Sequence, residues 1–225
     1  MVDPVEAVKP GAPVVWPEAP DNIVAAMSYG DAAKVEEAFA KAAGDALAKI
    51  GPQVMLSDGI AEAYRAGSNR AAGVATPVFE GESHGRNALP AIYKTTAEEF
   101  LRDHTLAEEV FGPMGVIVTV SDGDQMLDVA EAMEGQLTAT LHLDDGDIDL
   151  AARLMPILER KAGRILANGW PTGVEVADAM VHGGPYPATT NFGATSVGSM
   201  AIRRFLRPVS YQNIPEALLP EDLRG

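Results

Sequence analysis

The residues best suited to bind a ligand are Glu109 and Phe111, within the stretch Glu108-Glu109-Val110-Phe111-Gly112-Pro113. A carboxylate accepts hydrogen bonds from both hydroxyls of a ribose, and a nearby aromatic ring packs on the sugar or on a nicotinamide. The Gly112-Pro113 pair is typical of a turn that fixes both side chains at a sheet edge. The same motif by itself is equally compatible with an ordinary turn between a helix and a strand.

Cysteine is missing from all 225 residues. This excludes disulfides, thiolate metal sites and thiol nucleophiles from the chain. Only serine, threonine, lysine or a carboxylate could act covalently here. We predict no catalytic residue and no metal site within these residues.

Two further motifs favour structural roles. Gly81-Glu82-Ser83-His84-Gly85 fits the Gly-x-Ser-x-Gly pattern of a hydrolase nucleophile, but Pro90 follows where a helix should run, so we expect a polar hairpin turn. The acidic run from Asp144 to Asp149 lacks the ligand order and closing glutamate of a calcium loop, and we expect it to cap a helix.

The four histidines and one glycine-rich run gave no stronger signal. His84, His104, His142 and His182 show no metal-ligand spacing, and we expect each to be a surface or hydrogen-bonded residue. The run from Gly193 to Gly198 could cradle a phosphate, but no strand precedes it, so a flexible turn is favoured.

The composition is that of an ordinary globular domain, with 47% hydrophobic and 22% charged residues. A formal charge of −15 would repel nucleic acid and an anionic membrane surface. No stretch approaches the roughly 20 apolar residues of a membrane span, and residues 1–6 lack the character of a signal peptide. We therefore expect a cytoplasmic protein that binds neither nucleic acid nor membranes.

The elements that must position Glu109 and Phe111 follow from periodicity. Residues 1–30 contain five prolines and predict an extended arm, residues 31–213 a single domain, and residues 214–225 a surface tail. In the domain, Val35, Phe39, Ala42, Ala46 and Ile50 recur at helical spacing. A short helix around Ile60 to Tyr64 is expected to end at Gly67. Strands are predicted at 74–80 and, at a sheet edge because of Pro90, at 89–93.

The second half of the domain predicts alternating strands and helices. Thr96 with Glu99 forms a capping box for a short helix, and strands are expected at 116–120, 137–143 and 164–167. Helices are expected at about 124–133 and 148–162, the second kinked at Pro156. This order favours an α/β fold with a largely parallel sheet and flanking helices.

From about Pro52 to Leu219, several stretches together resemble the C-terminal, catalytic-domain half of aldehyde dehydrogenases, most closely the branch that oxidises α-ketoglutarate semialdehyde (2,5-dioxopentanoate). They occur in the family's order and spacing. The stretches are Met55 to Ile60 with Ala63-Tyr64-Arg65, Leu106 to Pro113, Glu159 to Leu166, Asn168-Gly169-Trp170-Pro171-Thr172-Gly173-Val174 and His182-Gly183-Gly184-Pro185-Tyr186-Pro187-Ala188-Thr189.

The resemblance implies oxidation of an aldehyde to an acid with NAD or NADP as hydride acceptor. It makes Glu109 the ribose-binding carboxylate and Phe111 its neighbour on the nicotinamide side. Asn168 matches the asparagine that helps to shape the aldehyde pocket, and Trp170, Pro171 and His182 are expected near it.

The chain departs from the family upstream of this region. The nucleophilic cysteine, the general-base glutamate, the oxyanion asparagine and the Rossmann unit are not recognisable, so we expect the cofactor domain to be absent. This predicts a truncated chain that is inactive in isolation. Two hypotheses follow: part of an oxidoreductase whose missing half is supplied elsewhere, or a non-catalytic remnant that acts as an oligomerisation or protein-interaction module. Either predicts a homo-oligomer or a partner, because a lone catalytic half exposes apolar surface.

Overall fold

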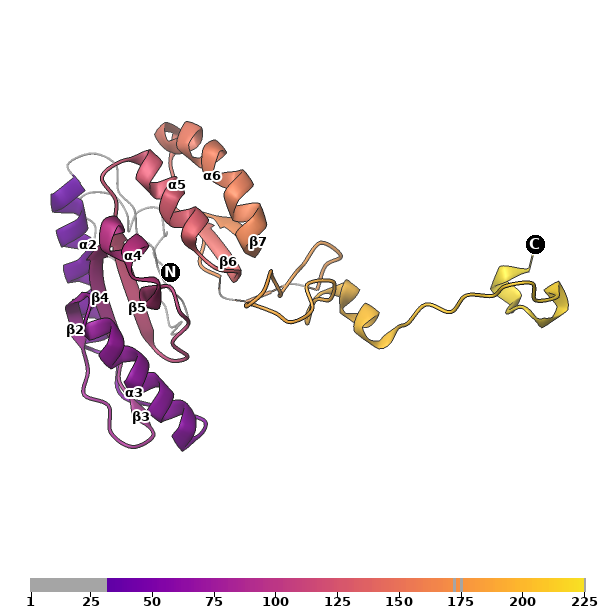
Figure 1. Ribbon diagram of the computed structural model, residues 1–225, viewed down its shortest axis with the longest axis horizontal. Helices are drawn as coiled ribbons and strands as arrows, with labels where there is room; N and C mark the ends of the chain where they lie inside the picture. Colours follow the sequence, from indigo (N-terminus) through magenta and orange to yellow (C-terminus); the bar gives the residue numbers. More distant parts are fainter. Residues whose placement is uncertain (1–31, 172, 175, 225) are drawn as a thin grey trace.

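The computed structural model describes residues 32–171, 173–174 and 176–224 of the chain. The predicted extended arm at residues 1–30 lies outside these residues. Helices and strands alternate along the described part (Figure 1), which confirms the α/β class.

The helices and strands lie close to the predicted ranges. The α-helices are α2 (Ala32–Leu47), α3 (Asp58–Ala72), α4 (Ala97–Arg102), α5 (Gly123–Ala132) and α6 (Ile148–Lys161). The strands are β1 (Gln53–Val54), β2 (Thr76–Glu80), β3 (Asn87–Ala88), β4 (Ala91–Thr96), β5 (Met114–Thr119), β6 (Gln136–Leu141) and β7 (Ala162–Ala167). Short 3-10 helices are η1 (His104–Leu106), η2 (Asp145–Asp147), η3 (Ser199–Phe205), η4 (Glu216–Leu218) and η5 (Glu221–Leu223).

The described strands form three small sheets. In the order β2-β4-β5, β4 pairs parallel to β5 and antiparallel to β2, while β6 and β7 form a separate parallel pair and β1 and β3 an antiparallel one. The parallel pairs are joined through helices, α4 between β4 and β5 and α6 between β6 and β7, as parallel pairing requires. The connection between β2 and β4 is too short for such a crossover, so that pair is antiparallel.

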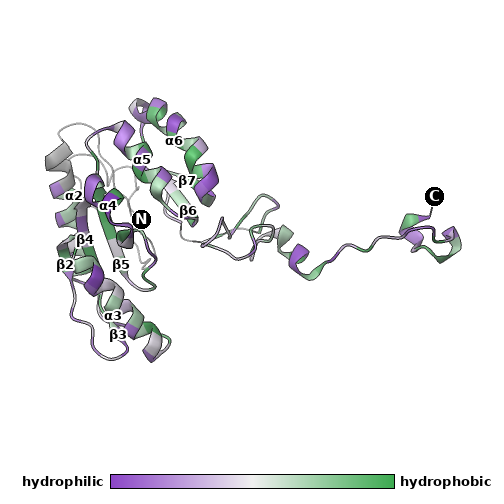
Figure 2. Ribbon diagram, in the orientation of Figure 1, coloured by the Kyte–Doolittle hydropathy of each residue, from purple (hydrophilic) through white to green (hydrophobic). Residues whose placement is uncertain are grey.

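The main core lies between α3, α4 and the central strands. Tyr64, Tyr93, Phe100 and Val116 are at most 2% exposed. Figure 2 shows the outer helices carrying many hydrophilic residues, whereas the sequence of β5 is largely apolar, MGVIVT. Residues Val116 to Val118 are all buried, so β5 is covered on both faces. This explains why its sequence is a continuous apolar run and does not alternate with polar residues.

A second cluster lies between α5 and α6. Met126 and Ala130 of α5 and Leu154 of α6 are buried, and Leu141 of β6 packs against them. Val129 of α5 belongs to the main core instead. Helix α5 therefore contacts both clusters and links the two parts of the molecule.

Two predictions around α3 and β4 were wrong. Helix α3 continues through Gly67 to Ala72, because Gly67 is buried against Val110, whose methyl carbons would lie 2.6 Å from an added Cβ. Strand β4 is the centre of its sheet and not an edge, since Pro90 stands just before its first residue and removes no hydrogen bond from the ladder.

The helix predicted from residue 31 is confirmed as α2, and its buried face only partly matches the predicted stripe, with which it shares Phe39. Among the described side chains of α2, the buried hydrophobic ones are Ala40 and Ala43, which form a cluster with Ile92 and Ile117, and Phe39 and Leu47 pack against this cluster. Ile50 lies beyond the helix and is 39% exposed. Among the described residues, no helix is long and apolar enough to cross a membrane; the cytoplasmic location stays a prediction.

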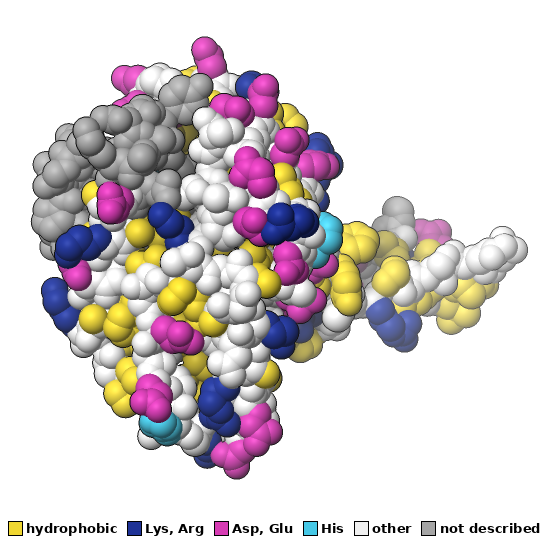
Figure 3. All heavy atoms as spheres, turned by 60° about the vertical axis from the view of Figure 1, so that its left-hand side comes forward, with side chains coloured by type: hydrophobic (Ala, Val, Ile, Leu, Met, Phe, Trp, Pro, Cys, Tyr) yellow, Lys and Arg dark blue, Asp and Glu magenta, His cyan; other side chains and the backbone are white. Residues whose placement is uncertain are grey.

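The chain ends in an extended segment that projects from the rest of the molecule (Figure 1). We call residues 199–224 the terminal arm. It holds η3, η4 and η5, none of which buries a residue. Figure 3 shows hydrophobic side chains on the projecting part, while acidic and basic side chains are both scattered over the visible face of the body.

Candidate functional site

The segment that carries Glu109 and Phe111 is anchored through the residue between them. Val110 packs against the main core and against Gly67 of α3. Glu109 is exposed and the Phe111 ring is 66% exposed. The backbone is thus anchored to the main core through Val110, while the Glu109 carboxylate and the Phe111 ring face solvent.

The turn that follows is fixed by close packing on Tyr64. Gly112 has φ of +149°, and a Cβ there would lie 2.3 Å from the Tyr64 ring. The Tyr64 hydroxyl donates to the carbonyls of Leu89 (2.6 Å) and Pro113 (3.3 Å). The Ala91 amide also donates to the Pro113 carbonyl, at 2.9 Å. Only glycine fits at position 112, which explains the Gly-Pro pair of the motif.

Asn168 lies just beyond the carboxyl end of β7 and joins it to the residues after β6. Its side-chain carbonyl accepts from the Leu143 amide, and its NH₂ group donates to the Leu143 carbonyl, both at 2.9 Å. Its own amide donates to the Leu141 carbonyl, and its φ is +50°. Asn168 therefore extends the pairing of β6 and β7 by one step and sets the direction of the chain toward Trp170.

Trp170 and Pro171 lie on this continuation. The Trp170 ring lies against the His142 ring, with centroids 4.9 Å apart and an interplanar angle of 47°. The Pro171 carbonyl accepts a hydrogen bond from the Arg164 guanidinium of β7 at 3.1 Å. The carboxyl ends of parallel strands are where α/β proteins place ligands, so the location suits a pocket wall.

His142 is a residue that sequence reasoning missed. The expectation of a surface or hydrogen-bonded histidine was wrong, because both ring nitrogens are buried without a partner among the described residues. Burial lowers the pKa of this imidazole. Thr140 Oγ1 and Arg164 Nε are likewise buried and unpartnered within the described part of the chain. The feature of the sequence that could have pointed to His142 is its position at the end of β6, beside the end of β7.

His182 has an exposed side chain, and its backbone makes the contacts. Its amide donates to Thr195 Oγ1 at 2.9 Å, and its carbonyl accepts from the Ser196 hydroxyl at 3.2 Å. The Thr195 hydroxyl in turn donates to the Val197 carbonyl at 3.0 Å. The glycine-rich run from Gly193 thus closes on the segment of His182, in keeping with a turn.

Five of the six predicted site residues form two groups, and His182 belongs to neither. Glu109 and Phe111 share a segment that packs on the main core, whereas Asn168, Trp170 and Pro171 share a segment that follows β7. Helix α5 contributes both to the main core, on which Val110 packs, and to the cluster on which Leu141 at the end of β6 packs. The structure thus brings together the residues within each group.

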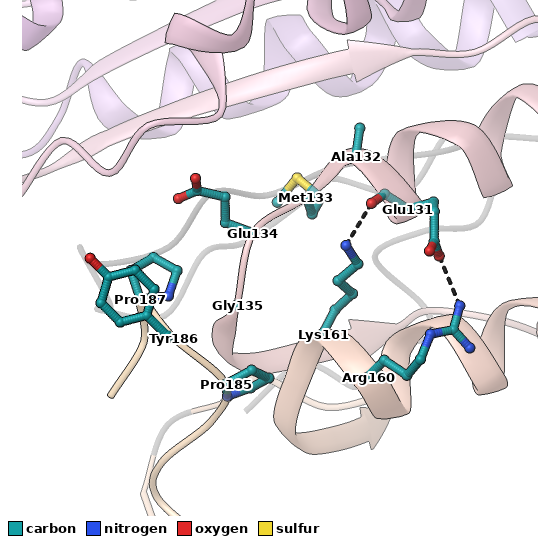
Figure 4. A pocket seen from close by; sticks show the side chains of 10 residues that line it. All are labelled: Glu131, Ala132, Met133, Glu134, Gly135, Arg160, Lys161, Pro185, Tyr186 and Pro187. Atoms are coloured by element: carbon teal, nitrogen blue, oxygen red, sulfur yellow. Dashed lines mark hydrogen bonds and ion pairs between the residues drawn. The ribbon is translucent and has the colours of Figure 1, made fainter. Parts of the chain in front are cut away.

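Two pockets lie elsewhere on the surface, and none of the six predicted residues lines either of them. The larger, about 480 Å³, lies between the end of α5, the end of α6 and Pro185 to Pro187. Figure 4 shows Arg160 and Lys161 reaching toward Glu131 there, at 2.9 Å to its carboxylate and 2.6 Å to its carbonyl. The smaller, about 350 Å³, is lined by α3 and the residues from Glu80 to Ser83.

The remaining motifs have structural roles. Ser83 Oγ accepts from the Leu89 amide at 2.9 Å and so closes the turn between β2 and β4. Asp144 and Asp147 form a capping box at η2, before α6. Within residues 32–171, 173–174 and 176–224, no group of three or more His, Cys, Asp or Glu could hold a metal ion.

Comparison with curated proteins identifies the family of the chain. Alpha-ketoglutaric semialdehyde dehydrogenase 2 of Azospirillum brasilense is 53% identical over 190 residues, which cover 83% of this chain and 36% of that protein. Over this matched part, the chain belongs to the aldehyde dehydrogenase family. The alpha-ketoglutaric semialdehyde dehydrogenase of Acinetobacter baylyi is 43% identical over 184 residues, or 77% of this aldehyde dehydrogenase chain and 34% of the relative.

Solved structures agree on the fold. A NAD-dependent benzaldehyde dehydrogenase from Corynebacterium glutamicum is 21% identical to this aldehyde dehydrogenase chain, with a TM-score of 0.50 over 61% of this chain and 31% of that one. A scan against family models found no match. The chain spans about a third of the length of the curated relatives it matches.

Proposed function

We propose that this chain supplies part of the cofactor and substrate walls of a NAD(P)-dependent aldehyde dehydrogenase that oxidises α-ketoglutarate semialdehyde to the acid. The observation that carries the proposal is the outward presentation of Glu109 and Phe111 on a segment locked by Val110 and Gly112. The 53% identity to a dehydrogenase of that name supports the substrate.

The side chains present fit a dinucleotide. An exposed carboxylate accepts hydrogen bonds from a ribose diol, and a ring that is 66% exposed gains by being covered by a sugar or a nicotinamide. Glu109 and Phe111 would hold that end of NAD or NADP, and the cofactor when bound accepts hydride from the aldehyde carbon. On the other wall, Asn168 fixes the segment of Trp170 and Pro171, which with His182 would border the aldehyde.

The chain by itself should not turn over substrate. Family chemistry requires a thiolate that attacks the aldehyde carbon, and the 225 residues contain no cysteine. Loss of a covalent nucleophile typically removes several orders of magnitude in rate. A complementing polypeptide would have to bring the thiol and the rest of the cofactor site.

A second function is supported by a separate observation. The terminal arm exposes large apolar side chains, among them Phe205 (86%), Leu206 (65%) and Leu218 (71%). Apolar surface of this kind marks an interaction site. We therefore keep the alternative that the chain serves as a non-catalytic oligomerisation or protein-interaction module.

Weak cofactor binding by the purified chain tests the proposal directly. Ligand-observed NMR would follow saturation transfer to the nicotinamide-ribose protons of NAD⁺ and of NADP⁺. We expect transfer with the natural chain and a loss of transfer in Glu109→Ala and Phe111→Ala. Glu108→Ala is the matched control, because Glu108 is an exposed neighbouring carboxylate that pairs with Arg70 at 3.6 Å. Equal transfer in all four proteins would overturn the assignment.

Turnover separates the two functions. The chain alone, given α-ketoglutarate semialdehyde and either cofactor, should produce no reduced nicotinamide. Addition of a cysteine-bearing cofactor half should restore production if the chain is part of an enzyme, and Glu109→Ala should reduce it. Reduced nicotinamide formed by the chain alone would contradict the thiol argument.

A further inference from the structure

Arg164 stands on the face of the β6–β7 sheet that points away from α5 and α6. Leu141 of β6 packs with the helices, and it pairs with Ala167 of β7. Because side chains alternate along a strand, Thr138 and its partner Arg164 point to the opposite face. The guanidinium thus lies under the segment that leads from Asn168 toward Met180.

The guanidinium contacts this segment at three places. Nη2 donates to the Pro171 carbonyl at 3.1 Å, and Nη1 donates to the Gly173 carbonyl at 2.9 Å. Nη1 also approaches Met180 Sδ at 3.9 Å. A planar group with several fixed donors can hold residues seven, nine and sixteen positions further along the chain in one arrangement.

We propose that Arg164 is a positioning residue, which holds the segment of Trp170 and Pro171 in place from beneath as the wall of the aldehyde pocket. Asn168 fixes the start of the segment by its two bonds to Leu143, and Arg164 fixes its continuation. The guanidinium acts through backbone carbonyls, so its effect does not depend on the side chains of the segment. The interpretation of this segment as a wall of the aldehyde pocket rests on the proposed function, whereas the contacts of Arg164 do not depend on that function.

Lysine cannot reproduce this arrangement fully. Its single ammonium is a point donor on a flexible stem, while the guanidinium holds two carbonyls with separate nitrogens. A methionine at the position keeps the length and apolar character of the stem but donates no hydrogen bond. The three residues therefore form a graded series of decreasing anchoring.

Hydrogen exchange and tryptophan quenching test the proposal in the full chain. The Met180 amide, bonded to the Ala177 carbonyl at 3.2 Å, reports opening of the segment, and the amides of β5 report global unfolding. In Arg164→Met we expect the Met180 amide to exchange about tenfold faster, equivalent to about 1.4 kcal/mol. Arg164→Lys should lie between Arg164→Met and the natural chain, with exchange in β5 unchanged in both.

Acrylamide quenching reports the position of Trp170. In a Trp16→Phe background Trp170 is the single tryptophan, since the chain has two. Arg164→Met should raise the quenching constant, and Arg160→Met should leave it unchanged, because Arg160 binds Pro156 and Glu131 instead. Unchanged Met180 exchange and Trp170 quenching in Arg164→Met, or equal acceleration in β5, would overturn the positioning role. Absence of saturation transfer to the cofactor with the natural chain would instead count against the proposed function and not against this inference.

Discussion

At the scale of single residues, the side chains with strongest constraints lie beneath the candidate cofactor segment. Tyr93 is fully buried, with its hydroxyl 2.7 Å from Ser68 Oγ and donating to Glu80 Oε1 at 2.9 Å. Tyr64 is 2% exposed and binds two carbonyls. The Tyr64 ring packs on Gly112, and Tyr93 lies on β4 beside β5, the strand that follows Gly112, so perturbing either ring should reach the site.

Gly112→Ala should destabilise the fold and distort the segment of Glu109. The added Cβ would meet the Tyr64 ring at 2.3 Å, and φ of +149° is unfavourable for alanine. We expect a loss of about 1 to 3 kcal/mol in the free energy of unfolding, measured by urea titration. Gly59→Ala is the control, because Gly59 lies in α3 with nothing within 4 Å of an added Cβ. The free energy of unfolding of Gly59→Ala should rise by up to about 1 kcal/mol. If Gly112→Ala were as stable as Gly59→Ala, the packing argument would be refuted.

Tyr93 should make stability decrease at alkaline pH. Burial raises its pKa from 10.0 to about 12, with the Glu80 carboxylate adding to the effect. A folded-state pKa above the unfolded value means that the contribution is fully present below pH 10 and is lost as pH rises toward 12. Burial also raises the pKa of Tyr64 well above its usual value, so part of the effect remains without Tyr93.

The test is urea unfolding between pH 9 and pH 12. Tyr93→Phe should cost about 1 to 3 kcal/mol near neutral pH, because Ser68 loses its partner, and should flatten the alkaline decline. Tyr186→Phe, at a ring that is 78% exposed, should change neither quantity. An alkaline slope in Tyr93→Phe as steep as in the natural chain would argue against a raised pKa.

At the scale of elements, α5 is the part whose stability matters most, because it packs in both cores. It begins at Asp122, whose carboxylate accepts from the Gln125 amide at 2.9 Å. This backbone hydrogen bond, followed by one from Ser121, lowers the pKa of Asp122 below its usual 3.8. A depressed pKa stabilises the fold above pH 3.8, and that stabilisation is lost as pH falls through the lower folded value.

Asp122→Asn should separate capping from charge. Asparagine is as good an N-cap as aspartate, so the melting temperature near neutral pH should fall little. The decline in melting temperature from pH 5 to pH 2 should be shallower than in the natural chain, since one titrating group is gone. Asp122→Ala should lower the melting temperature at every pH by loss of the cap. If Asn and Ala variants behave alike near neutral pH, Asp122 does not cap α5.

At the scale of the whole molecule, we propose that the terminal arm mediates association. Its large apolar side chains are exposed, and Arg203, Arg204 and Arg207 place positive charge at its start on a chain with a net charge of −15, while Glu216, Glu221 and Asp222 lie further along it. Apolar residues give such a contact its free energy, and opposite charges favour the encounter with an acidic surface. A second copy of the chain offers such a surface, which supports the predicted homo-oligomer.

Light scattering of the purified chain should give a mass above that of the 23.6 kDa monomer. Phe205→Asp with Leu206→Asp should shift the particle toward the monomer, because both side chains are exposed on the arm. Leu56→Asp, an equally exposed change on the body, should leave the mass unaltered. A natural chain that is monomeric at all concentrations would contradict association through the arm.

The sequence by itself determined what depends on neighbouring residues. Thr96 accepts from the Glu99 amide and starts α4, which is one half of the predicted capping box, whereas the Glu99 carboxylate pairs with Arg102. The order of strands and helices follows local periodicity. The family motif likewise identified Glu109 and Phe111 as candidates. Such features need only a few consecutive residues, so they can be recognised without knowing the rest of the fold.

Only the tertiary structure decided what depends on residues distant in the sequence. Gly67 lies inside a helix where Val110 packs on it, and His142 contacts Trp170 and Arg164 contacts Pro171 because β6 and β7 lie side by side. Asn168 bonds to Leu143, 25 positions away, and Tyr64 to Pro113, 49 positions away. Each of these contacts is selected by close packing of the whole chain, which no short stretch of sequence encodes.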